Sequence, residues 1–289
     1  MSIYDENKID DGLSMLDMLI FFSKYYKYLL GGGLLGGILG VVIAFTLPAQ
    51  WEANALVRVG QLGSTGSTGS TGSAIEPSLQ VVDRIKNKSF QNDVLKNLGL
   101  STDEDDNVGN AFRDSLKVKL EKSDLIGLTI RGSSPEVAKQ HMSAVINQIK
   151  SIHTKISAPT IQRRQQELAS IQLELKKANA ESERLVKSLD GRTDSLNEKS
   201  FSQAALLSNI LLAREAELKN SRDRKRVLEE QLSPERTFST MELGRVEVSE
   251  KPVFPKKSLF ALAGLFLGLL FAVLWSALKS ISARKNLPA

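Results

Sequence analysis

The sequence predicts an α+β membrane protein in which two transmembrane helices flank an extracytoplasmic α/β base that carries a long, projecting helical hairpin. Three observations predict this class: an uncharged apolar segment near each end of the 289-residue chain, strand-like alternation on both sides of the middle, and two long polar helix-forming segments. The expected domains are a cytoplasmic tail (1–27), a first transmembrane helix (28–47), an extracytoplasmic domain (48–257, with its base in 48–158 and 237–257 and its hairpin in 159–236), a second transmembrane helix (258–278) and a second cytoplasmic tail (279–289).

The most apolar segment covers residues 259–278 and contains neither a charge nor a proline. About twenty residues in a helix extend for about 30 Å, which is the thickness of the hydrocarbon core of a bilayer. A charged side chain at mid-span would cost about 2.5–3.5 kcal/mol on insertion scales, and none is present. The segment therefore predicts a transmembrane helix.

Residues 28–47 form a second uncharged apolar run, which ends at Pro48. A cleaved secretory signal is the alternative, but its apolar core would span only 7–15 residues and its leader would be short and basic, not long and acidic as here. Helical spacing of leucines in residues 13–20 indicates a short amphipathic helix at the membrane surface, with a disordered tail as the alternative for the first ten residues.

Positive charges predict the orientation of both helices. Lys24 and Lys27 precede the first span, and Lys279 follows the second together with Arg284 and Lys285. The positive-inside rule therefore places both termini in the cytoplasm. Lys256 and Lys257 oppose this assignment, but a long loop is translocated largely regardless of its charge.

Both spans carry glycines four residues apart, a spacing that lets two helix backbones approach closely. The sequence therefore predicts that the spans pack against each other or against a partner in the membrane. The glycines concerned are Gly32, Gly36, Gly40, Gly264 and Gly268.

The base is predicted from local patterns. Alternation indicates strands at 51–59, 116–120, 125–131 and 238–248, and helical spacing indicates a helix over 79–98 that ends at Gly99. A further helix opens at Ser134 and Pro135. The repeated Gly-Ser-Thr segment 63–73 should be a flexible loop. These elements suit a small mixed sheet with helices packed on it.

Residues 101–107 allow two interpretations. Asp103, Asp105 and Asn107 have the spacing of a calcium loop, but Val108 replaces its required glycine. A capping box formed by Ser101 and Glu104 at the start of a helix is the favoured interpretation.

Two long segments predict the hairpin. Residues 159–189 show a narrow heptad-like apolar stripe, and a second helix covers about 199–232 and ends before Pro234. If the helix that opens at Pro135 continued to residue 189, it would be about 80 Å long and would have to project from the base. We expect the stripe to contact other copies of the chain; its residues are Leu168, Ile171, Leu175, Leu185 and Leu189.

The residues indicate no enzyme, cofactor or metal site. The chain has no cysteine, its two histidines are twelve residues apart, and it lacks the common nucleophile, phosphate-loop and zinc motifs. The net charge of +5 is spread among mixed charges, unlike the clustered basic face of a nucleic-acid binder. Arginine clusters at 163–164 and 222–226 could attract anionic sugars or phosphates, although a solvated, ion-paired helix surface is favoured.

This layout resembles the polysaccharide co-polymerases, the Wzz-type regulators of O-antigen or related chain length. The resemblance rests on the segment 9–30 that leads into the first span, the strand 51–59 and the segment 251–268. In the last of these, Pro252, Pro255, Gly264 and Gly268 match the family's proline-rich approach to a glycine-bearing second span. Ser249 stands where the fuller pattern often has another proline.

The resemblance implies a non-enzymatic protein of the bacterial inner membrane with a periplasmic domain. Copies of the chain would form a ring and act with a membrane polymerase to set the length of a lipid-linked polysaccharide. One alternative is an adaptor of a capsule or exopolysaccharide export complex that activates a separate tyrosine kinase. Some family members carry such a kinase after the second span, where this sequence has about eleven residues. A two-span receptor with a helical sensor domain is the third and least favoured interpretation.

Overall fold

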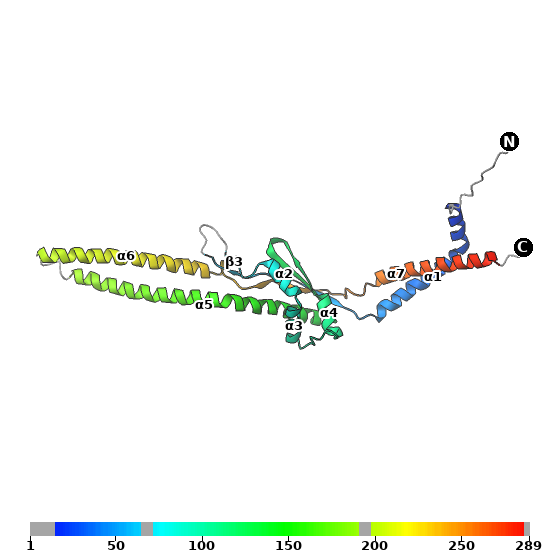
Figure 1. Ribbon diagram of the computed structural model, residues 1–289, viewed down its shortest axis with the longest axis horizontal. Coiled ribbons are helices and arrows are strands. Elements are labelled where there is room, and N and C mark those ends of the chain that lie inside the picture. Colours follow the sequence, from blue (N-terminus) through cyan, green and yellow to red (C-terminus); the bar gives the residue numbers. More distant parts are fainter. Residues whose placement is uncertain (1–14, 65–71, 191–197, 286–289) are drawn as a thin grey trace, which may run out of the picture. The chain divides into compact units, whose positions relative to one another are not determined.

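The computed structural model describes residues 15–64, 72–190 and 198–285 (Figure 1). The chain divides into a membrane unit, formed by residues 1–51 and 250–289, and a second unit formed by residues 52–249. The predicted fold class is confirmed: apolar helices lie at the two ends of the chain, and between them a mixed strand-and-helix domain contains one very long helix. The predicted disordered start of the chain and most of the Gly-Ser-Thr segment fall outside the described residues.

Two helices make up the membrane unit. Helix α1 (Met15–Thr46) begins within the predicted amphipathic stretch 13–20 and continues through the first predicted span in one element, and α7 (Lys257–Lys285) contains the second. Ser23–Thr46 and Lys257–Lys279 are long and apolar enough to cross a membrane. Next to these helices, Gln50 donates to the Phe254 carbonyl at 3.0 Å, and Val253 donates back to the Gln50 carbonyl at 2.8 Å.

The second unit is built on a four-stranded sheet in the order β4 (Lys117–Leu120), β5 (Leu125–Gly132), β1 (Trp51–Arg58) and β6 (Met241–Val248). The β4–β5 and β1–β6 pairs are antiparallel. All four strands were predicted from alternation. A β-bulge between Asn54 and Leu56 shifts the register of β1 against β6, where Gly244 has a φ of +83° that suits glycine.

Helices cover one face of this sheet. Alternate residues of β1 and β5 are buried there, and they face helix α5 (Pro135–Asp190) and helix α2 (Ser78–Lys86). The opposite sheet face is open. The core consists of Ala53, Val57, Val81, Ile85, Ile126, Leu128, Ile130, Met142, Ile146 and Ile149, each at most 2% exposed. Burial of this apolar set is the main stabilisation of the base.

The predicted helix over 79–98 is wrong in one respect, because it is two helices. Helix α2 ends at Lys86 and α3 (Lys88–Asn97) begins after Asn87, whose backbone is extended. The Asn87 side chain accepts from the Ser89 N–H at 2.8 Å and so caps α3. Gly99, with φ of +71°, ends α3 as predicted.

The capping box predicted at Ser101 is also wrong. Helix α4 (Asn107–Ser115) begins six residues later, and Asp106 caps it by accepting from the Gly109 N–H at 2.9 Å. Ser101 accepts instead from the Asp103 N–H at 3.1 Å, within a turn. Among the described residues, Asp103 and Asp105 included, no three or more histidine, aspartate or glutamate side chains lie close enough together to hold a metal ion.

A helical hairpin completes the second unit. Helix α5 has 56 residues, which corresponds to about 84 Å, and α6 (Glu198–Leu232) packs along its distal part (Figure 1). Pro159 lies inside α5 at an exposed position, and α5 continues through it. The helix therefore does not begin at residue 159: its first part packs on the sheet and its second part forms the hairpin. A two-stranded ribbon of β2 (Gln61–Leu62) and β3 (Ser73–Ala74) and a short 3₁₀ turn, η1 (Lys122–Asp124), make up the remaining elements.

Candidate functional site

The five glycines singled out in the two spans meet in one place, which we call the glycine seam (Gly32, Gly36, Gly40, Gly264 and Gly268). Helices α1 and α7 pack along it so closely that the backbones touch. A Cβ placed on Gly36 would lie 2.7 Å from the Gly268 Cα, and one placed on Gly264 would lie 3.0 Å from the Gly40 Cα. Real side chains essentially never approach that closely, so larger residues would force the two helices apart.

The side chains around the seam are apolar and exposed. Leu35 is 64% exposed, Phe271 73% and Trp275 67%. A shallow apolar groove of about 740 Å³ runs beside the seam between α1 and α7, bordered by Leu39, Leu267 and Phe271. In a bilayer this surface would contact lipid tails or another membrane protein.

Pro252 and Pro255 lie between the end of β6 and the start of α7. Their neighbours Val253 and Phe254 carry the backbone hydrogen bonds to Gln50. The Phe254 ring packs edge-on against Phe260 in the first turn of α7, at 6.2 Å between centroids. The prolines therefore stand where the chain enters the second span, which is the position that the sequence motif predicts.

The apolar stripe of the hairpin packs against the second helix of the same chain. Ile171 is 2% exposed and Leu175 8%, and both are buried against Leu218 and Leu228 of α6 in the same chain. Leu168 packs against this cluster as a partly buried residue. A helix of the same chain therefore covers this part of the stripe, and the expected contact with other copies stays a prediction.

The remaining two residues of the stripe lie further along the hairpin. Leu185 is partly buried, and Leu189 falls outside the residues whose side chains the structure describes. The apolar side chains that the hairpin leaves open are on other faces. They include Leu173, Val186, Leu206, Ile210 and Leu212, which are 45–62% exposed.

A buried polar cluster connects four segments of the second unit. His153 of α5 is 2% exposed; its Nδ1 lies 2.5 Å from Thr240 Oγ1, and its Nε2 lies 3.4 Å from Glu76 Oε2. Arg84 of α2 donates to Glu76 Oε1 at 2.8 Å. Thr240 also accepts from the Gly60 N–H at 2.9 Å. The cluster thus connects α5 and α2 to the segments before β6 and after β1.

The charges in this cluster act on one another. Burial lowers the pKa of His153, and the nearby Glu76 carboxylate offsets part of that shift. The hydrogen bond to Glu76 raises the pKa of Arg84. Because Thr240 Oγ1 accepts from Gly60, its own proton is available for His153 Nδ1, which favours the tautomer with a proton on Nε2 facing Glu76.

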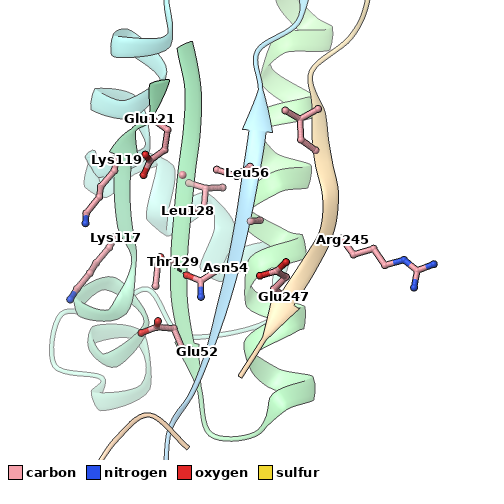
Figure 2. Close-up of a pocket in the computed structure, with 13 residues that line it drawn as sticks. Glu52, Asn54, Leu56, Lys117, Lys119, Glu121, Leu128, Thr129, Arg245 and Glu247 are labelled. Carbon is pink, nitrogen blue, oxygen red and sulfur yellow. Dashed lines mark hydrogen bonds between the residues drawn. The ribbon is translucent and has the colours of Figure 1, made fainter. Parts of the chain in front are cut away.

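The open sheet face carries a shallow pocket of about 440 Å³ (Figure 2). At its centre the Thr129 hydroxyl donates to Asn54 Oδ1 at 2.6 Å. Lys117 and Lys119 of β4 border one edge, and Arg245 extends from β6 at the other. The lining side chains are mixed charges, one amide, one hydroxyl and apolar groups, and the hydroxyl, that of Thr129, donates to the Asn54 amide oxygen and not to a base.

Comparison with known proteins gives a limited result. No protein-family model matches the sequence, and neither does any curated protein. Among solved structures, the chain is similar to a full-length bacterial polysaccharide co-polymerase, with a TM-score of 0.43 and 10% identity over 95% of this chain and 100% of that one. It is also similar to a point mutant of the Shigella flexneri lipopolysaccharide O-antigen chain-length regulator, with a TM-score of 0.22 and 10% identity over 71% of this chain and 98% of that one.

These two structures belong to the family that the sequence motifs resemble. Both TM-scores are below 0.5.

The buried cluster around His153 was missed by sequence reasoning. The two histidines gave no metal spacing, and nothing in the sequence connects His153 to Glu76 or Thr240. A histidine at a core-facing position of α5, in register with the buried Ile146 and Ile149, is the one available signal.

Proposed function

We propose that this chain is a non-enzymatic regulator of polysaccharide chain length, of O-antigen or a related polymer, in the bacterial inner membrane. Two membrane helices anchor a periplasmic domain, with both termini in the cytoplasm. The single observation that carries the proposal is the glycine seam. It joins the first span to the second, which follows Pro252 and Pro255, and the contact involves Gly264 and Gly268, the glycines that match the family motif.

The rest of the structure agrees with a scaffold. The domain between the spans is a small sheet with a helix of about 84 Å, and the one hydroxyl in its open pocket donates to an amide oxygen and not to a base. A helix of that length gives a wide surface for assembly and little enclosed space for chemistry.

We infer two partners. Copies of the chain associate through the hairpin's outward apolar side chains, such as Leu206 and Leu212, and through the base. A membrane polysaccharide polymerase docks against the apolar groove beside the seam, and the growing lipid-linked polysaccharide is extended next to it. Lipid covers the remaining apolar surface of the two helices.

Deleting the gene tests the proposal, because loss of a chain-length regulator changes the distribution of surface polysaccharide lengths on a gel. An affinity purification of the full chain from membranes tests the partners. Recovery of a tyrosine kinase or an outer-membrane channel in place of a polymerase would favour the export-complex adaptor instead.

A further inference from the structure

The hairpin brings together two arginine clusters that lie about sixty residues apart in the sequence. A pocket of about 530 Å³ opens between α5 and α6, and we call it the arginine pocket. Arg163 and Arg164 line it from α5, and Arg224 lines it from α6. Two acids, Glu167 and Asp223, complete its charged lining.

The acids of the pocket are already paired. Glu167 lies 3.3 Å from Arg224, and Asp223 lies 3.3 Å from Arg226 on the same helix. Arg163 and Arg164 have neither an ion pair nor a hydrogen bond in the part of the chain that the structure describes. The pocket therefore holds three guanidinium groups and two carboxylates, and its ion pairs leave out Arg163 and Arg164.

One nitrogen of Arg164 also lacks a hydrogen-bond partner although it is buried. Its Nη1 atom is shielded from solvent and has no hydrogen-bond acceptor. An unpaired donor that is removed from water is unfavourable, and more so when it is charged. Buried polar atoms in proteins normally have a partner, so this one calls for an acceptor that the chain itself does not provide.

The chemistry of the missing acceptor follows from the donors. A guanidinium presents a planar fork of N–H groups that matches a carboxylate or a phosphate, and such pairs are about twice as strong as neutral hydrogen bonds. Consecutive residues of a helix point about 100° apart, so Arg163 and Arg164 can approach one ligand from two directions. Thr160 and the buried Gln231 add neutral groups suited to sugar hydroxyls.

We propose that the arginine pocket binds the carboxylate or phosphate group of an anionic glycan. This inference rests on the proposed function, since it names the class of polymer that the hairpin contacts. The hairpin would then bind the polymer as well as serve as a scaffold, through charge-assisted hydrogen bonds from Arg163 and Arg164.

Calorimetric titration of the full-length protein in lipid nanodiscs tests it. The probes are an acidic tetrasaccharide of alternating glucuronic acid and N-acetylglucosamine, a neutral tetrasaccharide of N-acetylglucosamine, and inorganic phosphate. The proteins are the wild type, R163Q/R164Q and a matched control, R184Q/K187Q, which removes two charges from exposed positions of the same helix outside the pocket. Thermal melting of each variant establishes that the hairpin is folded.

The proposal predicts that the wild type and R184Q/K187Q bind the acidic tetrasaccharide, and that R163Q/R164Q binds it at least tenfold more weakly. The neutral tetrasaccharide should not bind. Competition by phosphate would identify a phosphate-bearing glycan as well as a carboxylated one, whereas binding of the acidic probe without such competition would identify the carboxylate alone. R163K/R164K, which keeps the charges but loses the forks, should bind with intermediate affinity.

Three results would overturn the inference: no binding of either anion by the wild type, equal binding of the neutral tetrasaccharide, or unchanged binding by R163Q/R164Q. A change in the mass of the assembly in R163Q/R164Q without loss of glycan binding would assign the two arginines to a contact between copies instead. If deletion of the gene alters polysaccharide length while no anion binds, the site inference fails and the proposed function stands.

Discussion

His153 Nε2 lies 3.4 Å from a carboxylate oxygen of Glu76, and both side chains are at least 93% buried. Arg84 donates a hydrogen bond to the other carboxylate oxygen of Glu76, and Thr240 Oγ1 is hydrogen-bonded to Nδ1 of the His153 imidazole. The cluster fixes the point where α5 leaves the sheet, next to the segment that leads into β6. Its protonation therefore bears on how firmly the hairpin is attached to the base.

Acidification should loosen this attachment. Burial lowers the pKa of His153 below the value of about 6.5 that it has in an unfolded chain. As the pH falls through 6.5, the unfolded state takes up a proton that the folded state resists, so stability is present above this pH and declines below it. We expect the melting temperature of the unit formed by residues 52–249 to fall between pH 7.5 and pH 5.5, and to fall less in H153Q.

His141 is the second buried histidine that should contribute to the pH dependence of stability. Burial lowers its pKa as well, although the Arg131 carbonyl, 3.1 Å from Nδ1, opposes the shift. A single H153Q variant should thus remove part of the pH dependence, and H141Q/H153Q should remove more. Equal slopes for the wild type and H141Q/H153Q would contradict the assignment.

A disulfide across the two membrane helices should form readily. The Cβ of Gly37, once present, would lie 3.8 Å from the Leu265 Cβ, which is the spacing found in disulfides. The chain has no native cysteine, so G37C/L265C has no background. With a protease site introduced at residues 65–71, oxidation should keep the two fragments together on a non-reducing gel.

G37C/L262C is the matched control, since Leu262 is 69% exposed on α7. It should give separate fragments after cleavage. Separate fragments from G37C/L265C, or a product of twice the chain's mass, would show that α1 and α7 of one chain do not pack together as described.

The hairpin core should respond sharply to truncation of a buried leucine. Leu218 is 7% exposed between α5 and α6, and L218A should cost about 2–5 kcal/mol. Hydrogen exchange of α6 amides by mass spectrometry should therefore accelerate by ~30-fold or more through local opening. L206A, at a position that is 61% exposed, should change the local free energy by about 0.5 kcal/mol or less. Equal effects of the two variants would rule out the intramolecular pairing of the helices.

The orientation in the membrane can be checked with a reporter that is active only outside the cytoplasm. Alkaline phosphatase fused after Ala289 should be inactive, because the proposed topology, based on Lys279 and its basic neighbours, has that end in the cytoplasm. The same enzyme inserted in residues 65–71 should be active. Activity of the C-terminal fusion would contradict the predicted topology, because it would place that end outside the cytoplasm.

Local patterns predicted the elements well because each has a short-range cause. Alternation with period two located the four strands, and the uncharged runs located both spans. The glycines at 32, 36 and 40 indicated a close helix contact, because a four-residue spacing places them on one face, but the sequence left open whether the second span or another protein makes that contact.

Longer-range relationships were not predictable from the sequence. The break between α2 and α3 occurs at Asn87, because its side chain caps α3. Asparagine is also tolerated within a helix, so its presence did not predict a break. His153 and Thr240 are 87 residues apart, and only the packing of α5 beside β6 brings them together. The stripe of Ile171 and Leu175 predicted a helix partner but could not distinguish α6 of the same chain from a second copy.

The most direct test of the central claim is the length distribution of surface polysaccharide in a strain that lacks the gene and carries it again on a plasmid. Three versions should be compared at equal membrane levels: the wild type, G36L in the seam, and G31L, whose position has no neighbour within 4 Å. We predict that the wild type and G31L restore a narrow modal length and that G36L leaves it broad. A distribution that is the same with and without the gene would contradict the account.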